Sequence, residues 1–328
     1  MTTVASNMRS KQLNLSLYET DKVKHGYLNA YDLVLEPWVN KEITLLEIGV
    51  RTGGSLKLWR DYFPRGTIVG IDRSLPRNFL PGERIFIFQG DQCNTRFLSQ
   101  VASKTAPGGF DIIIDDASHI GELTKIAFWH LFELHLKPGG LYAIEDWGTG
   151  YRADFPDGKQ FRTTPPVLQR VRNTLQRASG GTIKVPFPCH AYGMVGFVKE
   201  LIDEQGAASI TMQSPAGKRR GSRFQSVLVT DGIVFVTKVP PLGINASPNP
   251  VPAGKTVGRT IISWSTGSAD IGCVYVSVDG GREILFAQKN HGSTIVDWIK
   301  AGSAYEFRLY DSGHARLLAS VRVTGAQI

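Results

Sequence analysis

The chain has 328 residues, of which 42% are hydrophobic and 20% are charged, a composition typical of a folded globular protein and not of a disordered or fibrous one. Its length is enough for two domains of about 100–200 residues each. A formal net charge of +8 comes without the sequence signature of a nucleic-acid-binding fold, so we expect no nucleic-acid partner.

Three features of the sequence predict the cellular compartment of the protein: the start of the chain, its hydropathy and its cysteines. The first 14 residues are polar and lack the apolar core of a secretory signal. No stretch approaches the roughly 18 consecutive apolar residues that a membrane helix needs. The three cysteines are far apart and form neither a disulfide framework nor a metal-binding spacing. These features predict a cytoplasmic protein with no membrane span.

Alternating apolar and amphipathic segments cover most of the chain. From about Thr44 to Val239 they follow the pattern of βαβ units, which predicts a mostly parallel sheet. Residues 55–63 and 121–136 have apolar side chains at helical spacing. The second of these helices is expected to end at Lys137-Pro138-Gly139-Gly140 and to turn into the next strand. The expected strands are residues 43–49, 67–72, 85–90, 110–115 and 140–146.

The end of this region departs from a plain doubly wound dehydrogenase sheet. A further helix is expected at residues 193–206, and strands at 226–230 and 233–239 are joined by Asp231-Gly232, a strong hairpin signal. We therefore predict an α/β domain over residues 1–240. It has a Rossmann-like seven-stranded sheet with a terminal antiparallel hairpin, preceded by an N-terminal helical cap over residues 1–40.

A polar insert, residues 151–190, precedes the last helix and is expected to recognise the substrate. It holds seven Lys and Arg residues against two acids. Lys218, Arg219, Arg220 and Arg223 form a second basic cluster. Such clusters either attract an anionic or phosphate-bearing ligand or are simply a solvated surface, and both interpretations stay open.

The composition changes after residue 240. Proline-rich residues 240–254 indicate a stiff linker or the entry to a strand at a sheet edge. Short alternating strands follow, which predict an all-β, Ig/fibronectin-III-like sandwich over residues 241–328, with Trp264 in its core. No catalytic group stands out there, so a binding or assembly module is expected. Its predicted strands are residues 260–266, 273–281, 283–288, 304–311 and 317–324.

A glycine-rich turn follows the first strand of the α/β domain. Residues Glu47–Gly54 have the spacing E-x-G-x-x-x-G-G, and glycines there let the backbone approach a ligand closely. The G-x-G-x-x-G of dinucleotide folds is missing, because Arg51 stands where its second glycine would be. The second strand ends in Asp72, placed to accept hydrogen bonds from ribose hydroxyls. The third leads to Asp91 and Gln92, which are expected near an adenine.

The glycine turn, the acid that ends the second strand and the closing hairpin together resemble a class I S-adenosylmethionine-dependent methyltransferase. The resemblance implies that the turn surrounds the amino-acid moiety of S-adenosylmethionine and that Asp72 holds its ribose. The cofactor-binding residues that it implies are Glu47, Gly49, Thr52, Gly53, Ser55, Asp72, Asp91, Gln92 and Asp115.

Acidic residues follow two further strands. The fourth ends in Asp115-Asp116-Ala117-Ser118-His119 and the fifth in Glu145-Asp146-Trp147. In the sheet of that family these strands are neighbours about 4.8 Å apart, so four carboxylates meet at one edge. They repel one another unless a cation or protons neutralise them, and oxygen ligands favour Mg²⁺ first, then Mn²⁺ or Ca²⁺. Because side chains alternate along a strand, one Asp of the pair is expected to point at the ion.

The pattern resembles the metal-dependent sugar O-methyltransferases of macrolide tailoring, in which an Asp-x-x-His is combined with a Glu-Asp pair. The resemblance implies that Asp116, Glu145 and Asp146 are the metal ligands and that His119 is the general base. It covers roughly residues 15–240, and it includes an N-terminal segment with Tyr18-Glu19-Thr20-Asp21-Lys22, His25, Tyr27 and Tyr31.

Three functions stay open. The first is methylation of a sugar hydroxyl on a glycan or glycosylated metabolite, the second is catechol-type methylation, and the third is a non-catalytic cofactor-binding scaffold in polysaccharide assembly. The sandwich is expected to hold a glycan or a partner protein, or to self-associate. The aromatic residues around the insert stand among many Arg and Thr residues, which mildly favours a sugar. They are Tyr151, Phe155, Phe161, Phe187 and Tyr192.

Overall fold

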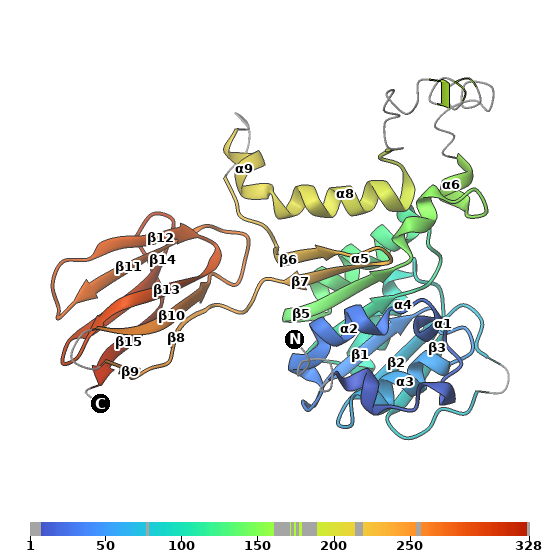
Figure 1. The fold of residues 1–328 in the computed structure, drawn as a ribbon, viewed down its shortest axis with the longest axis horizontal. Coiled ribbons are helices and arrows are strands. Elements are labelled where there is room, and N and C mark those ends of the chain that lie inside the picture. The colour runs from blue at the N-terminus through green and yellow to red at the C-terminus, as the bar shows by residue number, and fades with distance from the viewer. Residues whose placement is uncertain are drawn as a thin grey trace. The chain divides into compact units, whose positions relative to one another are not determined.

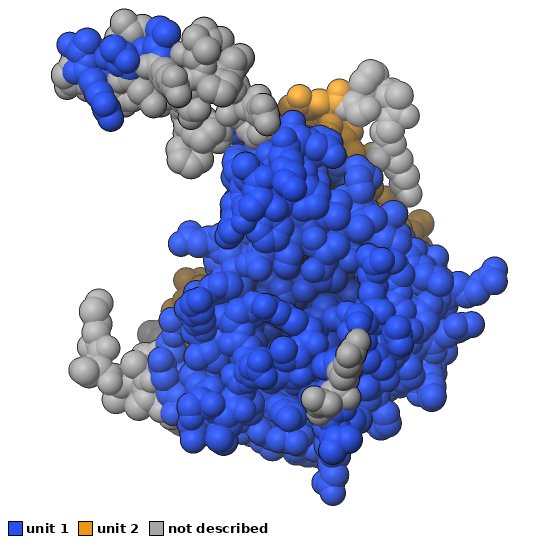
Figure 2. All heavy atoms as spheres, turned by 90° about the vertical axis from the view of Figure 1, so that its right-hand side faces the viewer, with its two compact units in different colours: residues 1–136, 142–201, 228–235 blue, residues 137–141, 202–227, 236–328 orange. Residues whose placement is uncertain are grey.

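The computed structural model describes residues 8–76, 79–160, 189–213, 219–253 and 257–326, together with residues 171, 174, 177 and 178. Its contacts divide the chain into two compact units (Figure 2). Unit 1 is residues 1–136, 142–201 and 228–235, and unit 2 is residues 137–141, 202–227 and 236–328. Unit 2 therefore takes in segments that precede residue 240 as well as the C-terminal sheets. Independent folding of residues 241–328 stays a prediction.

The predicted seven-stranded, mostly parallel sheet is confirmed. Its strand order is β3-β2-β1-β4-β5-β7-β6, and the β1–β2, β1–β4 and β2–β3 pairs are parallel (Figure 1). Its inner strands are nearly continuous apolar runs, as expected for a sheet buried on both faces. The strands are β1 (Thr44–Ile48), β2 (Thr67–Asp72), β3 (Ile85–Gln89), β4 (Phe110–Asp115), β5 (Leu136–Glu145), β6 (Phe224–Val229) and β7 (Ile233–Lys238).

Helices separate β1 from β2, β3 from β4, β4 from β5 and β5 from β6 along the chain. The predicted hairpin between β6 and β7 is confirmed by the hydrogen bond that Thr230 N donates to Ile233 O, at 2.9 Å.

None of the helices in the described ranges is long and apolar enough to cross a bilayer. The α-helices are α1 (Asp21–Lys24), α2 (Leu28–Leu35), α3 (Gly54–Tyr62), α4 (Thr95–Thr105), α5 (Gly121–Leu134), α6 (Pro156–Gln160), α8 (Gly193–Gln205) and α9 (Ala207–Met212), and the short 3-10 helices are η1 (Arg9–Gln12), η2 (Leu15–Leu17), η3 (Glu36–Trp38) and η4 (Trp147–Tyr151).

One predicted boundary is wrong. Helix α5 ends at Leu134, and Lys137-Pro138-Gly139-Gly140 lies inside β5 instead of forming a turn. The reason is tertiary: His135 O accepts a hydrogen bond from Phe110 N at 2.7 Å, and Gly139 N donates to Val239 O at 3.2 Å. Sheet pairing on both sides therefore overrides the local turn preference of proline and glycine, and β5 starts four residues before the predicted strand.

The C-terminal part of unit 2 contains two further sheets, of order β13-β10-β8 and β12-β11-β14-β15-β9. They share one buried core, which includes Trp264 as predicted. Strand β13 was not predicted, and the proline-rich join contains β8 and β9, whose few apolar side chains give a weak strand signal. The strands are β8 (Gly243–Ser247), β9 (Val251–Pro252), β10 (Val257–Ser265), β11 (Gly272–Val278), β12 (Ile284–Lys289), β13 (His291–Lys300), β14 (Ala304–Asp311) and β15 (Leu317–Ala326).

Candidate active site

The glycine turn after β1 brings three backbone segments together. Gly49 has φ +93°, and a Cβ there would lie 2.1 Å from the carbonyl oxygen of Asp116. A Cβ on Gly54 would lie 2.0 Å from the carbonyl oxygen of Glu19. Only glycine fits at either position, because any side chain would collide with main-chain atoms that cannot rotate away. The turn therefore packs against the end of β4 and against the N-terminal segment.

A cavity of about 960 Å³ opens beside this turn, in the size range of small-molecule sites. Four of the predicted cofactor residues line it: Gly49, Thr52, Ser55 and Asp72. The carboxylate of Asp72 also braces the turn, since its Oδ2 accepts hydrogen bonds from Val50 N at 2.8 Å and Arg51 N at 2.9 Å. Asp72 thus shapes the turn and faces the cavity as well.

The other predicted cofactor residues do not line this cavity. Gln92 is buried, and in the described part of the chain its Nε2 has no hydrogen-bond partner, so it retains a donor for a ligand. Asp91 is half exposed, and its Oδ2 lies 3.5 Å from Arg73 Nε. Gly53, with φ +84°, packs against Phe79. Glu47 is fully buried and accepts a hydrogen bond from Ser55 Oγ at 2.7 Å.

The adjacent aspartates at the end of β4 have different surroundings, as strand alternation requires. Asp115 is buried and accepts a hydrogen bond from Tyr142 Oη at 3.3 Å, and burial raises the pKa of its carboxyl group to about 7. Asp116 lies at the cavity wall beside His119. Of the pair, Asp116 therefore belongs with the acids at the end of β5.

His119 lies between two carboxylates. Its Nε2 is 4.0 Å from Asp116 Oδ1 and 3.8 Å from Asp146 Oδ2, and one ligand atom from each of the three residues lies within 4.8 Å of the others. His119 and Asp146 both have positive φ, +53° and +55°. Such backbone strain in non-glycine residues is concentrated at functional sites. The Nδ1 atom of His119 is buried and makes no hydrogen bond within the described residues.

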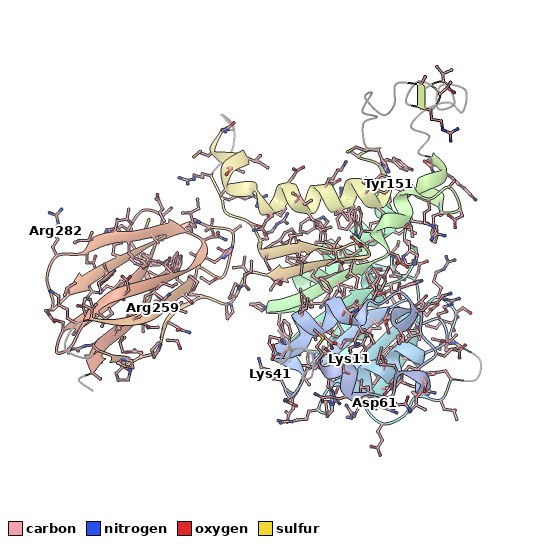
Figure 3. The ribbon with its side chains drawn as sticks, viewed as in Figure 1. Lys11, Lys41, Asp61, Tyr151, Arg259 and Arg282 are labelled. Carbon is pink, nitrogen blue, oxygen red and sulfur yellow. The ribbon has the colours of Figure 1, made fainter. Side chains whose placement is uncertain are left out.

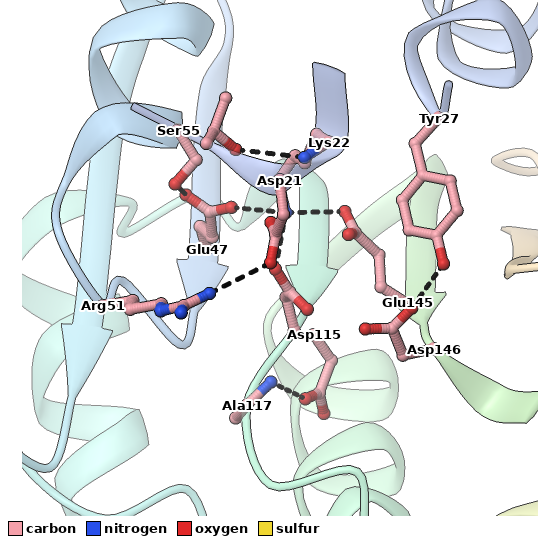
Figure 4. A network of polar contacts seen from close by, with 12 residues as sticks. Asp21, Lys22, Tyr27, Glu47, Arg51, Ser55, Asp115, Ala117, Glu145 and Asp146 are labelled. Atoms are coloured by element: carbon pink, nitrogen blue, oxygen red, sulfur yellow. Dashed lines mark hydrogen bonds and ion pairs between the residues drawn. The ribbon is translucent and has the colours of Figure 1, made fainter. Parts of the chain in front are cut away.

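Lys22, to which the sequence analysis assigned no role, occupies the centre of the acidic cluster (Figure 4). Its Nζ lies 2.6 Å from Asp116 Oδ2, 2.9 Å from Glu145 Oε1 and 3.2 Å from Glu47 Oε1, and only 1% of its side chain is exposed. A lysine in a short, polar N-terminal helix carries no local signal of burial. Only the long-range packing of α1 against the ends of β1, β4 and β5 reveals it.

The carboxylates of the cluster outnumber its cation, because Glu47, Asp116 and Glu145 surround one ammonium group and Asp146 adjoins them across His119. Burial, reinforced by Asp116, raises the pKa of Glu145 to about 8, and burial also raises that of Glu47. Burial lowers the pKa of Lys22, but the neighbouring carboxylates outweigh it and hold this pKa well above its ordinary value. A set of carboxylate oxygens with surplus negative charge and one imidazole fits a hard divalent cation such as Mg²⁺ or Mn²⁺.

Part of the insert is described. Phe155 packs its ring 5.9 Å from that of His119, at the edge of the acidic cluster. Tyr151 lies at the end of η4, and its ring centroid is 4.7 Å from that of His190. Its side chain remains partly exposed (Figure 3). Tyr192 is also partly exposed and donates a hydrogen bond to Gln160. Phe161 and Phe187 lie outside the described residues.

Known proteins match part of the chain. No family model matches it. It is 40% identical to mycinamicin VI 2''-O-methyltransferase of Micromonospora griseorubida over 138 residues, which are 40% of this chain and 34% of that protein. It is 32% identical to demethylmacrocin O-methyltransferase of Streptomyces fradiae over 202 residues, 56% of this chain and 50% of that protein.

A solved structure, MycE methyltransferase from the mycinamycin biosynthetic pathway in complex with Mg and SAH, has a TM-score of 0.49 and 31% sequence identity, over 65% of this chain and 50% of that one. The chain spans half or less of the length of the curated relatives it matches. It is similar to macrolide sugar O-methyltransferases over that part.

Proposed function

We propose that the protein is an S-adenosylmethionine- and divalent-metal-dependent O-methyltransferase that acts on a sugar hydroxyl of a glycosylated metabolite or glycan. The observation that carries this proposal is the position of His119 between Asp116 and Asp146, at the wall of a cavity that the glycine turn also lines. A base, a set of oxygen ligands and a cofactor-sized cavity therefore adjoin one another. The similarity to curated sugar O-methyltransferases supports the same reaction.

The cofactor is assigned to the cavity. Asp72 would accept hydrogen bonds from the ribose hydroxyls, and the Glu47–Gly54 turn would surround the amino-acid moiety. Gln92 does not line the cavity, and its contact to the adenine is proposed because its buried Nε2 makes no hydrogen bond within the described residues. In this arrangement the turn holds the methyl donor in place while leaving the side towards His119 open to the acceptor.

The metal ligands in the proposal are Asp116, Glu145 and Asp146. A bound divalent cation would fix two adjacent hydroxyls of the acceptor and lower the pKa of the one to be methylated. His119 accepts the proton at Nε2, the nitrogen that faces the two aspartates. Proton removal by a placed histidine typically accelerates a reaction by about 10²–10⁴-fold. Phe155 limits how the acceptor can approach this base.

The test is a turnover assay with labelled S-adenosylmethionine and four acceptor classes: glycosylated macrolides, sugar nucleotides, oligosaccharides and catechols. We expect methylation of a glycosylated acceptor that stops in EDTA and returns with Mg²⁺. Methylation of catechols alone would replace the sugar by a catechol substrate. Cofactor binding with no turnover on any acceptor would favour a scaffold, and full turnover in EDTA after metal-free preparation would remove the metal from the mechanism.

For the C-terminal sheets we propose an Ig/fibronectin-III-like sandwich that holds a glycan chain or a partner protein and supplies no catalytic group. Their single shared core supports independent folding. A chain that ends near Pro240 should stay folded and methylate a small acceptor with a similar kcat, while it loses affinity for a long or partner-bound acceptor. Loss of turnover on the small acceptor would show that these sheets complete the enzyme.

A further inference from the structure

The N-terminal segment Tyr18–Tyr31, which includes α1 and the start of α2, is attached to the glycine turn by its main chain. The carbonyl oxygen of Glu19 accepts a hydrogen bond from Thr52 Oγ1 at 2.9 Å and occupies the space that a side chain on Gly54 would fill. These contacts of the Glu19 main chain hold the segment beside the cavity.

Three side chains of this segment reach the three predicted metal ligands. Lys22 Nζ lies 2.6 Å from Asp116 Oδ2 and 2.9 Å from Glu145 Oε1. Tyr31 Oη donates to the same Oε1 of Glu145 at 2.5 Å. Tyr27 Oη donates to Asp146 Oδ1, as Figure 4 shows. Each carboxylate is thus held by one of its two oxygens.

In Asp116 and Asp146 the second oxygen faces His119. Asp116 Oδ1 and Asp146 Oδ2 face His119 Nε2 at 4.0 and 3.8 Å, beyond hydrogen-bond distance. In Glu145, Lys22 and Tyr31 both contact the same oxygen, Oε1. A carboxylate bound at one oxygen by a fixed donor cannot rotate freely, so its other oxygen has a defined direction.

We propose that the segment Tyr18–Tyr31 is the supporting layer of the metal site: Tyr27 and Tyr31 are positioning residues that fix Asp146 and Glu145 so that each presents its remaining oxygen to a divalent cation. This inference rests on the proposed metal-dependent function and names the residues that prepare the site for the cation. Lys22 does the same for Asp116 while it reduces the repulsion among the acids.

The tyrosines allow a clean test because they are neutral, and replacement by phenylalanine removes only the hydroxyl. Tyr18 is the matched control: it belongs to the same segment, but its Oη donates to Asp61 at 2.9 Å and not to the acidic cluster. Mn²⁺ affinity is measured by electron paramagnetic resonance titration of the full-length protein without acceptor, S-adenosylhomocysteine affinity by calorimetry, and stability by thermal unfolding.

We expect Tyr27→Phe and Tyr31→Phe each to weaken Mn²⁺ binding about tenfold, as removal of a partner behind a metal ligand typically does. Tyr18→Phe should change it less than twofold. S-adenosylhomocysteine affinity should stay within twofold in Tyr27→Phe and Tyr31→Phe; Tyr18 lines the cofactor cavity, so its variant is a control for Mn²⁺ affinity and stability only.

Unchanged Mn²⁺ affinity in Tyr27→Phe and Tyr31→Phe would overturn the inference while leaving the proposed function intact. A parallel loss of Mn²⁺ affinity, S-adenosylhomocysteine affinity and thermal stability would overturn it too, because the hydroxyls would then support only the fold. Wild-type protein that binds no Mn²⁺ would instead overturn the metal-dependent function itself, and the inference with it.

Discussion

Two clusters built around buried acids differ in their charge balance, with acids in excess in one and arginines in excess in the other. In the candidate active site, one lysine faces Glu47, Asp116 and Glu145, and the pKa values of both glutamates are raised. In unit 2, Glu204 on α8 accepts hydrogen bonds from two arginines: Arg220 Nη1 and Nη2, at 2.7 and 2.6 Å, and Arg223 Nε and Nη2, at 3.2 and 3.1 Å.

The two clusters differ in what they can still bind. Burial raises the pKa of Glu204, but the hydrogen bonds from Arg220 and Arg223 outweigh it and bring this pKa down to about 2. That carboxylate is satisfied by the protein itself. The acids around Lys22 are not, since one ammonium cannot neutralise them all. A cluster with unmet charge therefore indicates a ligand site, whereas a compensated cluster of similar composition is structural.

The same contrast bears on two of the four basic residues that follow α9. Arg220 and Arg223 are both engaged with Glu204, so this part of the chain's positive charge has a structural partner. Attraction of an anionic ligand is not needed to explain it.

The largest effect expected within the acidic cluster is on turnover. His119→Ala should reduce kcat by about 10²–10⁴-fold, because the acceptor hydroxyl loses its base. Cofactor affinity, measured by calorimetry, should stay unchanged, since the turn and Asp72 are untouched. Glu204→Gln serves as the control from the other cluster and should leave kcat alone. A His119→Ala variant within threefold of wild type would remove the base role.

Lys22→Met should lower the free energy of unfolding by about 3–5 kcal/mol at pH 8, because it leaves buried carboxylates without their cation. In the folded wild type the pKa of Glu145 is raised to about 8, so the folded state binds a proton that the unfolded state releases. Stability linked to this group therefore rises as the pH falls from 8 towards the ordinary glutamate value, and the variant should recover part of its loss there.

Urea unfolding between pH 5 and 8 measures this effect. Lys24→Met is the control, since Lys24 is on the same helix and exposed. Equal stability of the two variants at pH 8 would mean that Lys22 does not compensate the acids.

For Glu204→Gln we expect a loss of about 1.5–3 kcal/mol at neutral pH, the range for hydrogen bonds to a charged group. The pKa of Glu204 is lowered to about 2, so its contribution is complete above the ordinary glutamate value and disappears as the pH falls towards 2. Unfolding curves from pH 7 to 2 should converge for variant and wild type. Curves that stay parallel would contradict the pairing with the arginines.

Asp72→Ala should have the smallest effect, about a tenfold loss of S-adenosylmethionine affinity, the equivalent of one charge-assisted hydrogen bond. Asp72 differs from the other acids in that main-chain donors bind both its oxygens: Val50 N and Arg51 N bind Oδ2, and Ser74 N binds Oδ1 at 2.9 Å. The variant therefore also loosens the turn. Calorimetry measures the change, and unaltered affinity would take Asp72 out of the cofactor site.

Much of the fold and of the site follows from local sequence. The apolar runs of β1, β2 and β4 predict their strands, because burial on both faces of a parallel sheet demands such runs. Asp231-Gly232 predicts the hairpin through its turn preference. Once the strand order is assumed, the acids at the ends of β4 and β5 must lie together, and His119 with them.

Tertiary structure alone decided the rest. Pairing with neighbouring strands moved the start of β5 into Lys137-Pro138-Gly139-Gly140, and pairing with β10 made strands of β8 and β13. The burial of Lys22, Tyr27 and Tyr31 against acids about a hundred residues away has no local signature. Local sequence sets backbone preference and polarity, but the partner of a charged side chain depends on which distant segments the fold brings within about 3 Å of it.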